Sequence, residues 1–439
     1  MGIFFGTDGL RGKVNDELSV NVAYKCGNAL AGKHQKAKIL IGRDTRLSGS
    51  LFSIAFASGA VNAGASVIDV GVCPTAGISF LTKELGFDYG VVISASHNPA
   101  EFNGIKILNG EGEKIGSEKE EELERSFLRE YVKPNAELGS YSFNTQLVKK
   151  YSEFLQNSIS HSLEKLTIVL DCANGAAFKI APAVFRKCGA KVIATFCKPT
   201  GLNINENCGA VHAETLRKNV VKYHADMGFA FDGDSDRVIA VDGSGKIVDG
   251  DAIIYILACD YLKSGKLTNK CVVGTRHTNS GLEKALERLD VKMIRTNIGD
   301  KYVRYAMREN NLLIGGEQSG HIIMADKLGT GDGVLTALCL SEICAKNNST
   351  LAGLCDFKLF DQCNISIKVK DKLRVINSEK LSIETENQEK DLHGKGRIMI
   401  HVSGTEPCIR VMVESENGEV SKAVANRLCE TIKAVDKEL

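Results

Sequence analysis

The stretch Gly90-Val91-Val92-Ile93-Ser94-Ala95-Ser96-His97-Asn98-Pro99 joins an apolar run to an abrupt polar turn. The apolar run, residues 90–93, predicts a buried strand. Asn98-Pro99 is a turn signal, because a residue before proline is disfavoured in the helical region. Ser96 and His97 are therefore expected on a loop at the carboxyl end of a strand, where open α/β sheets form their sites. A serine beside a histidine there is a candidate nucleophile or phosphoryl carrier, although a loop that only turns the chain has the same composition.

The composition is typical of a soluble globular protein. The chain has 439 residues, 43% of them hydrophobic and 25% charged, and its length suggests about three domains. A net charge of +1 and the absence of tryptophan give no reason to expect nucleic acid or a membrane as partner. No apolar run is long enough to span a bilayer, and residues 1–6 lack the pattern of a signal peptide. The 14 cysteines form no Cys-x-x-Cys pair, which favours free thiols in a reducing cytoplasm.

A pattern of strand, polar turn, helix and strand occurs three times. We expect the strands at residues 38–41 and 66–70, 167–170 and 189–193, and 271–274 and 291–294, with helices at 50–62, 177–187 and 280–289. Each copy is a βαβ unit, whose crossover favours parallel pairing of the two strands. Near the end, strand runs at 365–369, 398–402 and 409–413 precede a helix at 420–435. This order predicts a small α+β domain after three α/β domains.

Three stretches are expected to be linkers: residues 133–143, 243–246 and 346–350. A charge-dense helix is expected just before the first of them, with its charges on a solvated face. We therefore expect α/β domains at residues 1–143, 144–243 and 244–358, and an α+β domain at 359–439.

The strongest chemical signal is Asp232-Gly233-Asp234-Ser235-Asp236-Arg237, which follows a predicted strand at residues 228–231. Carboxylates at alternate positions can fold around one hard cation, and oxygen ligands favour Mg²⁺ or Ca²⁺ over Zn²⁺. An EF-hand is excluded, because its sixth position would be Arg237 instead of glycine. Three crowded carboxylates are costly without a counter-charge, which argues against a purely structural role. The sequence therefore predicts a metal site here.

Three further stretches place glycines among polar side chains. Residues 5–12 contain a threonine and Arg11 and suit a loop that closes on an oxyanion, or a plain Asp-Gly turn. Residues 315–321 gather a carboxylate, an amide, a hydroxyl and His321, which suit hydrogen bonds to sugar hydroxyls. His321 is either a proton-transfer group or a structural histidine. Residues 403–410 offer hydroxyls, backbone N–H groups and an arginine, as in a phosphate nest or a turn with a salt bridge.

In this order, the motifs Thr-Asp-Gly-x-Arg-Gly, Ser-Ala-Ser-His-Asn-Pro, Asp-Gly-Asp-x-Asp-Arg and Ser-Gly-Thr-Glu-Pro resemble those of the α-D-phosphohexomutase superfamily. The combination is highly specific, whereas each motif alone is weak. Residues 171–177, 201–205 and 316–321 are similar to the bacterial phosphoglucosamine mutase branch. The resemblance covers nearly the whole chain. It implies three α/β/α domains with mixed sheets and a small C-terminal α+β domain, in a heart-shaped molecule with a central active-site cleft.

The resemblance implies an isomerase, an intramolecular phosphotransferase that interconverts glucosamine 6-phosphate and glucosamine 1-phosphate. The reaction would pass through a phosphoserine at Ser96 and a 1,6-bisphosphate, and would supply UDP-N-acetylglucosamine and peptidoglycan precursors. One Mg²⁺ would be held by Asp232, Asp234, Asp236 and an oxygen of the phosphorylated Ser96. Glucosamine 1,6-bisphosphate or glucose 1,6-bisphosphate would prime the serine, with a priming kinase left open. The expected partner is a phosphosugar, and a homodimer is also left open.

The resemblance also implies roles for side chains around the reacting group. The catalytic candidates besides Ser96 are Arg11, His97, Lys106 and His321. The substrate-binding candidates are Thr7, Arg237, Glu317, Ser319, Ser403, Gly404, Thr405 and Arg410. In this scheme Glu317 and Ser319 hold sugar hydroxyls, and the four residues of the last motif hold the phosphate that is not reacting.

The sequence departs from the family pattern at His401 and at Lys301, where arginine is usual at both positions. A neutral imidazole is a weaker phosphate partner than a guanidinium, so substrate affinity is the property in question. Three other functions are weighed: a phosphomannomutase or phosphoglucomutase, a non-catalytic phosphosugar-binding regulator, and a phosphatase. Ser96 and the three aspartates count against the regulator. A phosphatase explains neither Ser96 nor the terminal nest.

Overall fold

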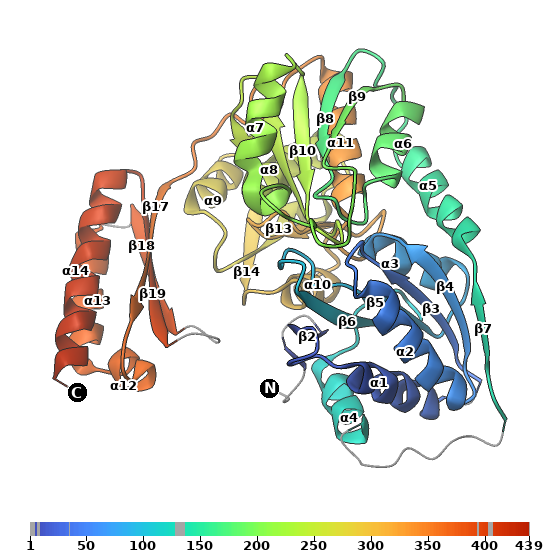
Figure 1. The fold of residues 1–439 in the computed structure, drawn as a ribbon. Helices are drawn as coiled ribbons and strands as arrows, with labels where there is room; N and C mark the ends of the chain where they lie inside the picture. The colour runs from blue at the N-terminus through green and yellow to red at the C-terminus, as the bar shows by residue number, and fades with distance from the viewer. Residues whose placement is uncertain are drawn as a thin grey trace. The chain divides into compact units, whose positions relative to one another are not determined.

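The computed structural model describes residues 5–6, 9–34, 36–127, 137–392, 395–402 and 407–438. They form four sheets with their surrounding helices (Figure 1). The chain divides into two compact units, one of Met1–His277 with Met293–Cys355 and the other of Thr278–Lys292 with Asp356–Leu439. The three α/β domains and the small α+β domain expected from the sequence are thereby confirmed as the architecture, with mixed sheets in all three α/β domains.

The first sheet has seven strands in the order β1-β2-β6-β5-β3-β4-β7. They are β1 (Phe5–Gly6), β2 (Gly9–Lys13), β3 (Lys38–Arg43), β4 (Ser66–Val72), β5 (Tyr89–Ile93), β6 (Phe102–Asn109) and β7 (Ser140–Phe143). β3 pairs in parallel with β4, as the βαβ pattern predicts, and also with β5. The β7 strand corrects the expected linker at residues 133–143, because residues 140–143 pair in parallel with β4 at the sheet edge.

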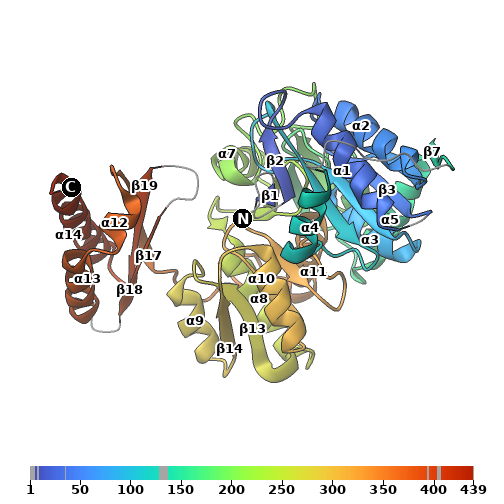
Figure 2. The same cartoon turned by 90° about the horizontal axis from the view of Figure 1, so that it is seen from below.

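Helices cover both faces of the first sheet. They are α1 (Val20–Gly32), α2 (Gly49–Asn62), α3 (Thr75–Glu84) and α4 (Ser117–Phe127). Because side chains alternate along a strand, Ile39 and Ile41 of β3 share the buried core with α1 and α2, whereas Gly42 faces Ile78 of α3. Figure 2 shows α2 and α3 on opposite sides of β3. The alternation thus gives each face of the sheet its own layer of apolar contacts with helices.

Helices α1 and α2 pack with their backbones in contact, and this contact makes one stability prediction. A Cβ atom on Gly27 would lie 2.1 Å from the carbonyl oxygen of Phe56. We expect Gly27→Ala to lower the free energy of unfolding by about 1–3 kcal/mol, because the helices must move apart. Chemical denaturation measures the change. Gly32→Ala in the same helix is the control, since nothing lies within 4 Å of its Cβ position. An equal loss in both variants would contradict this packing.

The second and third sheets continue the α/β plan. The second has the order β12-β11-β10-β8-β9 and the third β14-β13-β15-β16. Their strands are β8 (Thr167–Asp171), β9 (Lys191–Thr195), β10 (Met227–Phe231), β11 (Val238–Asp242), β12 (Ile247–Val248), β13 (Cys271–Thr275), β14 (Lys292–Thr296), β15 (Ile314–Gly316) and β16 (Ile322–Met324). β8 and β9 pair in parallel, as predicted. Residues 243–246 are not the expected linker, because they turn the chain between the antiparallel strands β11 and β12.

The helices of the larger unit that follow α4 are α5 (Val148–Asn157), α6 (Ile180–Lys187), α7 (Ala213–Lys222), α8 (Gly250–Lys263), α10 (Asp300–Glu309) and α11 (Gly333–Asn347). α9 (Ser280–Glu287) belongs to the smaller unit. The predicted helices at 177–187 and 280–289 correspond to α6, which begins three residues later than predicted, and α9, which ends two residues earlier.

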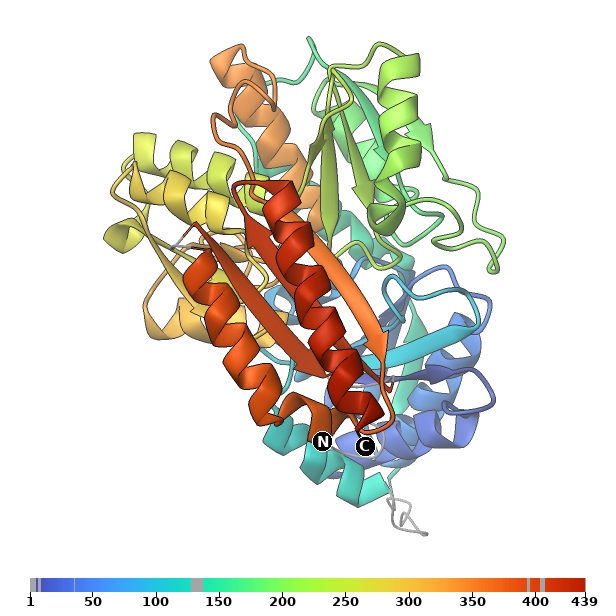
Figure 3. The same cartoon turned by 90° about the vertical axis from the view of Figure 1, so that its left-hand side faces the viewer.

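The smaller unit is built on an antiparallel sheet in the order β17-β19-β18. Its elements are β17 (Asp361–Lys368), α12 (Lys372–Ile376), α13 (Glu379–Asp391), β18 (Gly396–Val402), β19 (Cys408–Ser415) and α14 (Gly418–Lys437). The predicted strands and the last helix are confirmed. α12 and α13 were not expected, because residues 371–391 are mostly polar. Figure 3 shows α13 and α14 lying across one face of this sheet.

Two further expectations concern disulfide bonds and membrane-spanning helices. All 14 cysteines are free thiols. Within the described ranges, no helix combines the length and the apolar character needed to cross a membrane.

Candidate active site

Ser96 lies in the turn that follows β5, where the sequence places it. Its side chain is buried, and its φ of 52° lies in the left-handed region. That conformation costs free energy in a residue other than glycine, so the surrounding structure must hold it. Ser96 Oγ donates a hydrogen bond of 2.6 Å to Asp232 Oδ2. The serine turn of the first sheet and the aspartate loop of the second sheet therefore form one site.

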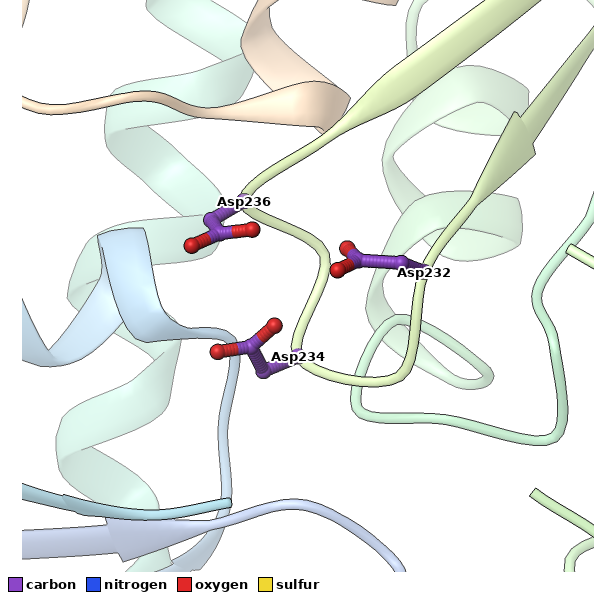
Figure 4. Close-up of side chains that lie close together, drawn as sticks. All are labelled: Asp232, Asp234 and Asp236. Carbon is purple, nitrogen blue, oxygen red and sulfur yellow. The ribbon is translucent and has the colours of Figure 1, made fainter. Parts of the chain in front are cut away.

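The aspartate loop lies between β10 and β11 and directs three carboxylates toward one space (Figure 4). One ligand oxygen from each of Asp232, Asp234 and Asp236 lies within 4.8 Å of the others. Gly233 lets this loop approach the serine turn, because a Cβ atom there would lie 2.5 Å from the carbonyl oxygen of Ser96. The glycine between the first two aspartates therefore permits the contact between the two loops.

The three carboxylates fit a divalent cation. All three are buried, and among the described residues Oδ1 of Asp234 and Oδ1 of Asp236 have no hydrogen-bond partner. Burial, followed by repulsion from Asp236 and Asp234, raises the pKa of Asp232 well above its usual value. Buried carboxylates with unsatisfied oxygens are stable only with positive charge between them. An all-oxygen donor set of this kind is the one that Mg²⁺ and Ca²⁺ prefer.

Lys106 on β6 supplies the nearest protein cation to the aspartate loop. Its buried Nζ donates to Asp234 Oδ2 at 2.8 Å and lies 3.4 Å from Asp236 Oδ2. Burial alone would raise the pKa of Asp236, but Lys106, His321 and Arg237 hold it well below its usual value. The predicted proximity of Lys106 to the reacting centre agrees with this geometry, although its role in proton transfer stays a prediction.

Two arginines bring positive charge to the serine turn. Arg11 on β2 donates from Nη1 to Asn98 Oδ1 at 3.4 Å. The backbone N–H of Arg237 donates to Asp232 Oδ1 at 3.3 Å. Burial, followed by repulsion from Arg237 and Arg11, lowers the pKa of His97 to about 4. His97 is therefore neutral near pH 7, and its Nδ1 lies 3.3 Å from Ser96 Oγ. The two arginines therefore add positive charge around the serine turn.

His321 connects the loop between β15 and β16 to the aspartate loop. It is buried, with Nδ1 at 3.7 Å from Asp236 Oδ2 and Nε2 at 3.8 Å from Asp300 Oδ2. Burial alone would lower the pKa of His321, but Asp236 and Asp300 raise it above its usual value. In the same loop, Glu317 accepts a hydrogen bond of 3.0 Å from the backbone of Gly299. Ser319 is exposed, which leaves its hydroxyl accessible.

Several predicted residues are not placed in this site. Thr7, Ser403, Gly404 and Thr405 lie outside the described residues. Arg410 is on β19 of the smaller unit, opposite His401 on β18.

Sequence reasoning missed residues that hold the site from neighbouring turns. Thr75, at the start of α3, donates from Oγ1 to Asp234 Oδ2 at 2.6 Å and from its backbone to Asp234 O at 3.0 Å. Asp44, Arg46 and Asn205 contact the serine turn or its supports. The polar turn directly after β3 was the sequence signal that could have indicated Asp44 and Arg46. The carboxyl ends of neighbouring parallel strands meet at one edge of a sheet, so this turn is expected beside the serine turn.

Comparison with known proteins agrees with the fold and the site. The chain matches the alpha/beta/alpha domains I, II and III of phosphoglucomutase/phosphomannomutase over residues 2–133, 148–245 and 249–360, and the C-terminal domain over residues 365–431. The chain therefore belongs to the phosphoglucomutase/phosphomannomutase family of enzymes. The resemblance to the α-D-phosphohexomutase superfamily is confirmed.

Curated relatives point to one branch of this family. The chain is 43% identical to the phosphoglucosamine mutase of Desulforamulus reducens, covering 98% of this chain and 99% of the relative. It is 42% identical to the phosphoglucosamine mutase of Shouchella clausii, covering 99% of both chains.

Solved structures share the fold across nearly the whole chain. A phosphoglucomutase/phosphomannomutase family protein of Burkholderia thailandensis has a TM-score of 0.85 at 24% identity, covering 99% of this chain and 97% of that one. The N-acetylphosphoglucosamine mutase of Aspergillus fumigatus, solved with GlcNAc-6P and magnesium, has a TM-score of 0.68 at 17% identity, covering 98% and 96%.

Proposed function

We propose that this chain is a phosphoglucosamine mutase that interconverts glucosamine 6-phosphate and glucosamine 1-phosphate. The observation that supports it most directly is the hydrogen bond of 2.6 Å from Ser96 Oγ to Asp232 in the buried aspartate loop. A serine oxygen beside a cation site suits a covalent phosphoryl carrier. The names of the curated relatives support glucosamine as the sugar. The product would feed synthesis of UDP-N-acetylglucosamine and peptidoglycan precursors.

The chain's own side chains divide the phosphoryl transfer between them. Asp232, Asp234 and Asp236 would hold Mg²⁺, which when bound neutralises the charge spread over a transferring phosphoryl group. A sugar hydroxyl attacks the phosphorus of phosphorylated Ser96 and gives its proton to a protein base. The bond from phosphorus to Oγ breaks, and Ser96 Oγ leaves with the electron pair and takes up a proton to restore the serine hydroxyl. His97 is a candidate base because its lowered pKa leaves it neutral. Lys106 and His321 are the other candidates.

Further side chains around the site would bind the phosphate groups and the sugar of the substrate. Arg11 and Arg237 would stabilise the reacting phosphoryl group, because guanidinium forks match phosphate oxygens. Glu317 and Ser319 would hold sugar hydroxyls. The distal phosphate would be held by the terminal nest of Ser403, Gly404, Thr405 and Arg410, and Thr7 is a further substrate-binding candidate. The nest must accept either end of the 1,6-bisphosphate, since the sugar turns over between the two transfers.

His401 makes one prediction about substrate affinity. Burial, followed by repulsion from Arg410, lowers the pKa of His401, so it adds no positive charge near pH 7. We expect His401→Arg to lower KM for the phosphosugar about threefold to tenfold with little change in kcat, because a guanidinium adds a charge-assisted hydrogen bond. Steady-state kinetics measures both constants. An unchanged or raised KM would mean that position 401 does not contact the phosphate.

The proposal extends to priming, assembly and location. An unphosphorylated serine is a weak nucleophile, so glucosamine 1,6-bisphosphate, glucose 1,6-bisphosphate or a kinase would first phosphorylate Ser96. A homodimer is supported by the exposed apolar side chains of Leu47, which lies just before α2, and of Leu51 and Ile54 on α2. Free thiols support a cytoplasmic location. Light scattering tests the assembly, and a monomer mass would remove the dimer from the proposal.

The test of the function compares three sugars. Protein primed with a trace of bisphosphosugar and supplied with Mg²⁺ is assayed on glucosamine, glucose and mannose 6-phosphates. We expect the highest kcat/KM on glucosamine 6-phosphate. A preference for glucose or mannose 6-phosphate would assign the chain to the phosphoglucomutases or phosphomannomutases. No turnover of any sugar by protein phosphorylated on Ser96 would support a regulator instead.

A further inference from the structure

The turn that carries Ser96 is held by one buried guanidinium. Arg46 follows β3, and its side chain has no exposed surface. Its Nη2 donates to the carbonyl oxygens of Ser96 at 3.0 Å and Asn98 at 2.8 Å. Its Nη1 donates to the carbonyl oxygen of Phe102 at 3.0 Å and to that of Pro99. The four N–H groups of the two terminal nitrogens therefore all point at main-chain carbonyls of the serine turn.

A carboxylate orients this guanidinium and reaches the other side of Ser96. Asp44 accepts from the Nε of Arg46 at 2.9 Å and from its backbone N–H at 2.9 Å. The same carboxylate accepts from Ser94 Oγ at 2.6 Å. Ser94 Oγ in turn accepts the backbone N–H of Ser96 at 2.9 Å. The N–H and C=O groups of Ser96 are thus both bonded to one connected network.

The second sheet adds a further donor to the same carbonyl groups. Asn205 Nδ2 donates to Ser96 O at 2.9 Å and to Asn98 O at 3.0 Å. We call Asp44, Arg46, Ser94 and Asn205 the serine clamp. The clamp surrounds the left-handed backbone of Ser96, which needs such support. It touches only the main chain of the turn and leaves Ser96 Oγ directed at Asp232.

We infer that Arg46 is a positioning residue for phosphoryl transfer, which fixes the main chain of residues 96–102 so that Ser96 Oγ faces the aspartate loop. This inference rests on the proposed function. Lysine cannot replace Arg46, because an ammonium group has three donors and no planar fork, whereas the turn presents four carbonyls. Phosphoryl transfer requires in-line geometry, and a misplacement of about 1 Å can cost roughly 100-fold in rate.

The test compares two arginine-to-lysine variants from the same strand end. In Arg46→Lys we expect kcat to fall about 100-fold with KM within about threefold, because the sugar contacts lie elsewhere. Amide hydrogen exchange should accelerate in residues 94–102 and stay unchanged in the strands of the first sheet. Arg43→Lys is the control, since Arg43 pairs with Asp69 at 3.3 Å. It should keep both constants within about threefold of the wild type.

The outcomes separate positioning from folding and from the proposed function. A wild-type kcat in Arg46→Lys, or faster exchange throughout the first sheet, would overturn the positioning role. If Arg46→Lys does not fold, Ser94→Ala replaces it, with about a tenfold loss of kcat expected and an unchanged kcat overturning the inference. If the wild type turns over no phosphosugar, the proposed function fails. Hydrogen exchange of residues 94–102 then still decides whether Arg46 holds the turn.

Discussion

Ser96→Ala should abolish mutase turnover, with kcat falling by at least about 10⁴-fold. The variant lacks the oxygen that would carry the phosphoryl group, which in the wild type lies 2.6 Å from Asp232 Oδ2. The three carboxylates stay in place. A coupled assay with glucosamine 6-phosphate measures the loss, and isothermal titration measures Mg²⁺ binding, which should persist.

Measuring both mutase turnover and Mg²⁺ binding in Ser96→Ala distinguishes loss of the phosphoryl carrier from loss of the fold. A folded Ser96→Ala that binds Mg²⁺ but does not turn over sugar supports Ser96 as the carrier. Residual turnover above about 1% of wild type would show that phosphate does not pass through Ser96. Loss of both Mg²⁺ binding and the melting transition would instead report a folding defect, and Ser96→Gly, which also lacks the hydroxyl and tolerates the φ of 52°, would then replace it.

Asp232→Asn should have the second largest effect. It should lower the affinity for Mg²⁺ without lowering the thermal stability of the metal-free protein. The variant removes one of the three carboxylate ligands, so we expect Mg²⁺ affinity to fall at least about 100-fold and kcat/KM about 10³-fold. Burial and repulsion raise the pKa of Asp232. Replacing it by a neutral amide therefore relieves repulsion in the metal-free protein, whose Tm should stay level or rise. Titration with Mg²⁺ and thermal unfolding with and without Mg²⁺ measure both effects.

Asp242→Asn is the matched control for that pair of effects. Asp242 ends β11, the strand that follows the aspartate loop, and accepts backbone hydrogen bonds from Ser244 at 2.8 Å and Ala352 at 3.1 Å. Burial alone would raise its pKa, but these bonds lower it, so its ionised form stabilises the fold. Asp242→Asn should lower Tm and leave Mg²⁺ affinity unchanged. Wild-type Mg²⁺ affinity in Asp232→Asn would refute the metal site.

The sequence predicted the strands and strand-end loops whose structure depends mainly on residues close to one another in the chain. Apolar runs bounded by polar turns identified β3, β5, β8 and β10, and placed Ser96 and the aspartates at strand ends. The expected linkers at residues 133–143 and 243–246 failed for a shared reason. Residues 140–143 are the edge strand β7, and residues 243–246 turn the chain into the edge strand β12. Each edge strand pairs with only one neighbour, so the sequence around it resembles a loop. α13 was missed because one buried leucine, Leu381, supplies most of its apolar anchor.

The sequence likewise predicted some residues of the candidate site and not others. Ser96 and the aspartate loop follow from their own spacing, because each motif lies within a few residues of one strand end. Arg46, Thr75 and Asn205 act through contacts between turns that are 50 to 159 positions apart in the chain. Such contacts depend on which strands are neighbours in the sheets, and spacing along one chain does not specify that order. The residues that hold the site were therefore visible only in three dimensions.

The measurement that tests the central claim most directly is a single-turnover chase of labelled phosphate. Protein labelled on Ser96 by phosphate exchange with a bisphosphosugar is mixed with excess glucosamine 6-phosphate and Mg²⁺, then quenched at short times. We predict that label leaves Ser96 as fast as turnover and is found first in glucosamine 1,6-bisphosphate. Label that stays on Ser96 while product forms, or that is released as inorganic phosphate, would contradict a phosphoserine mutase.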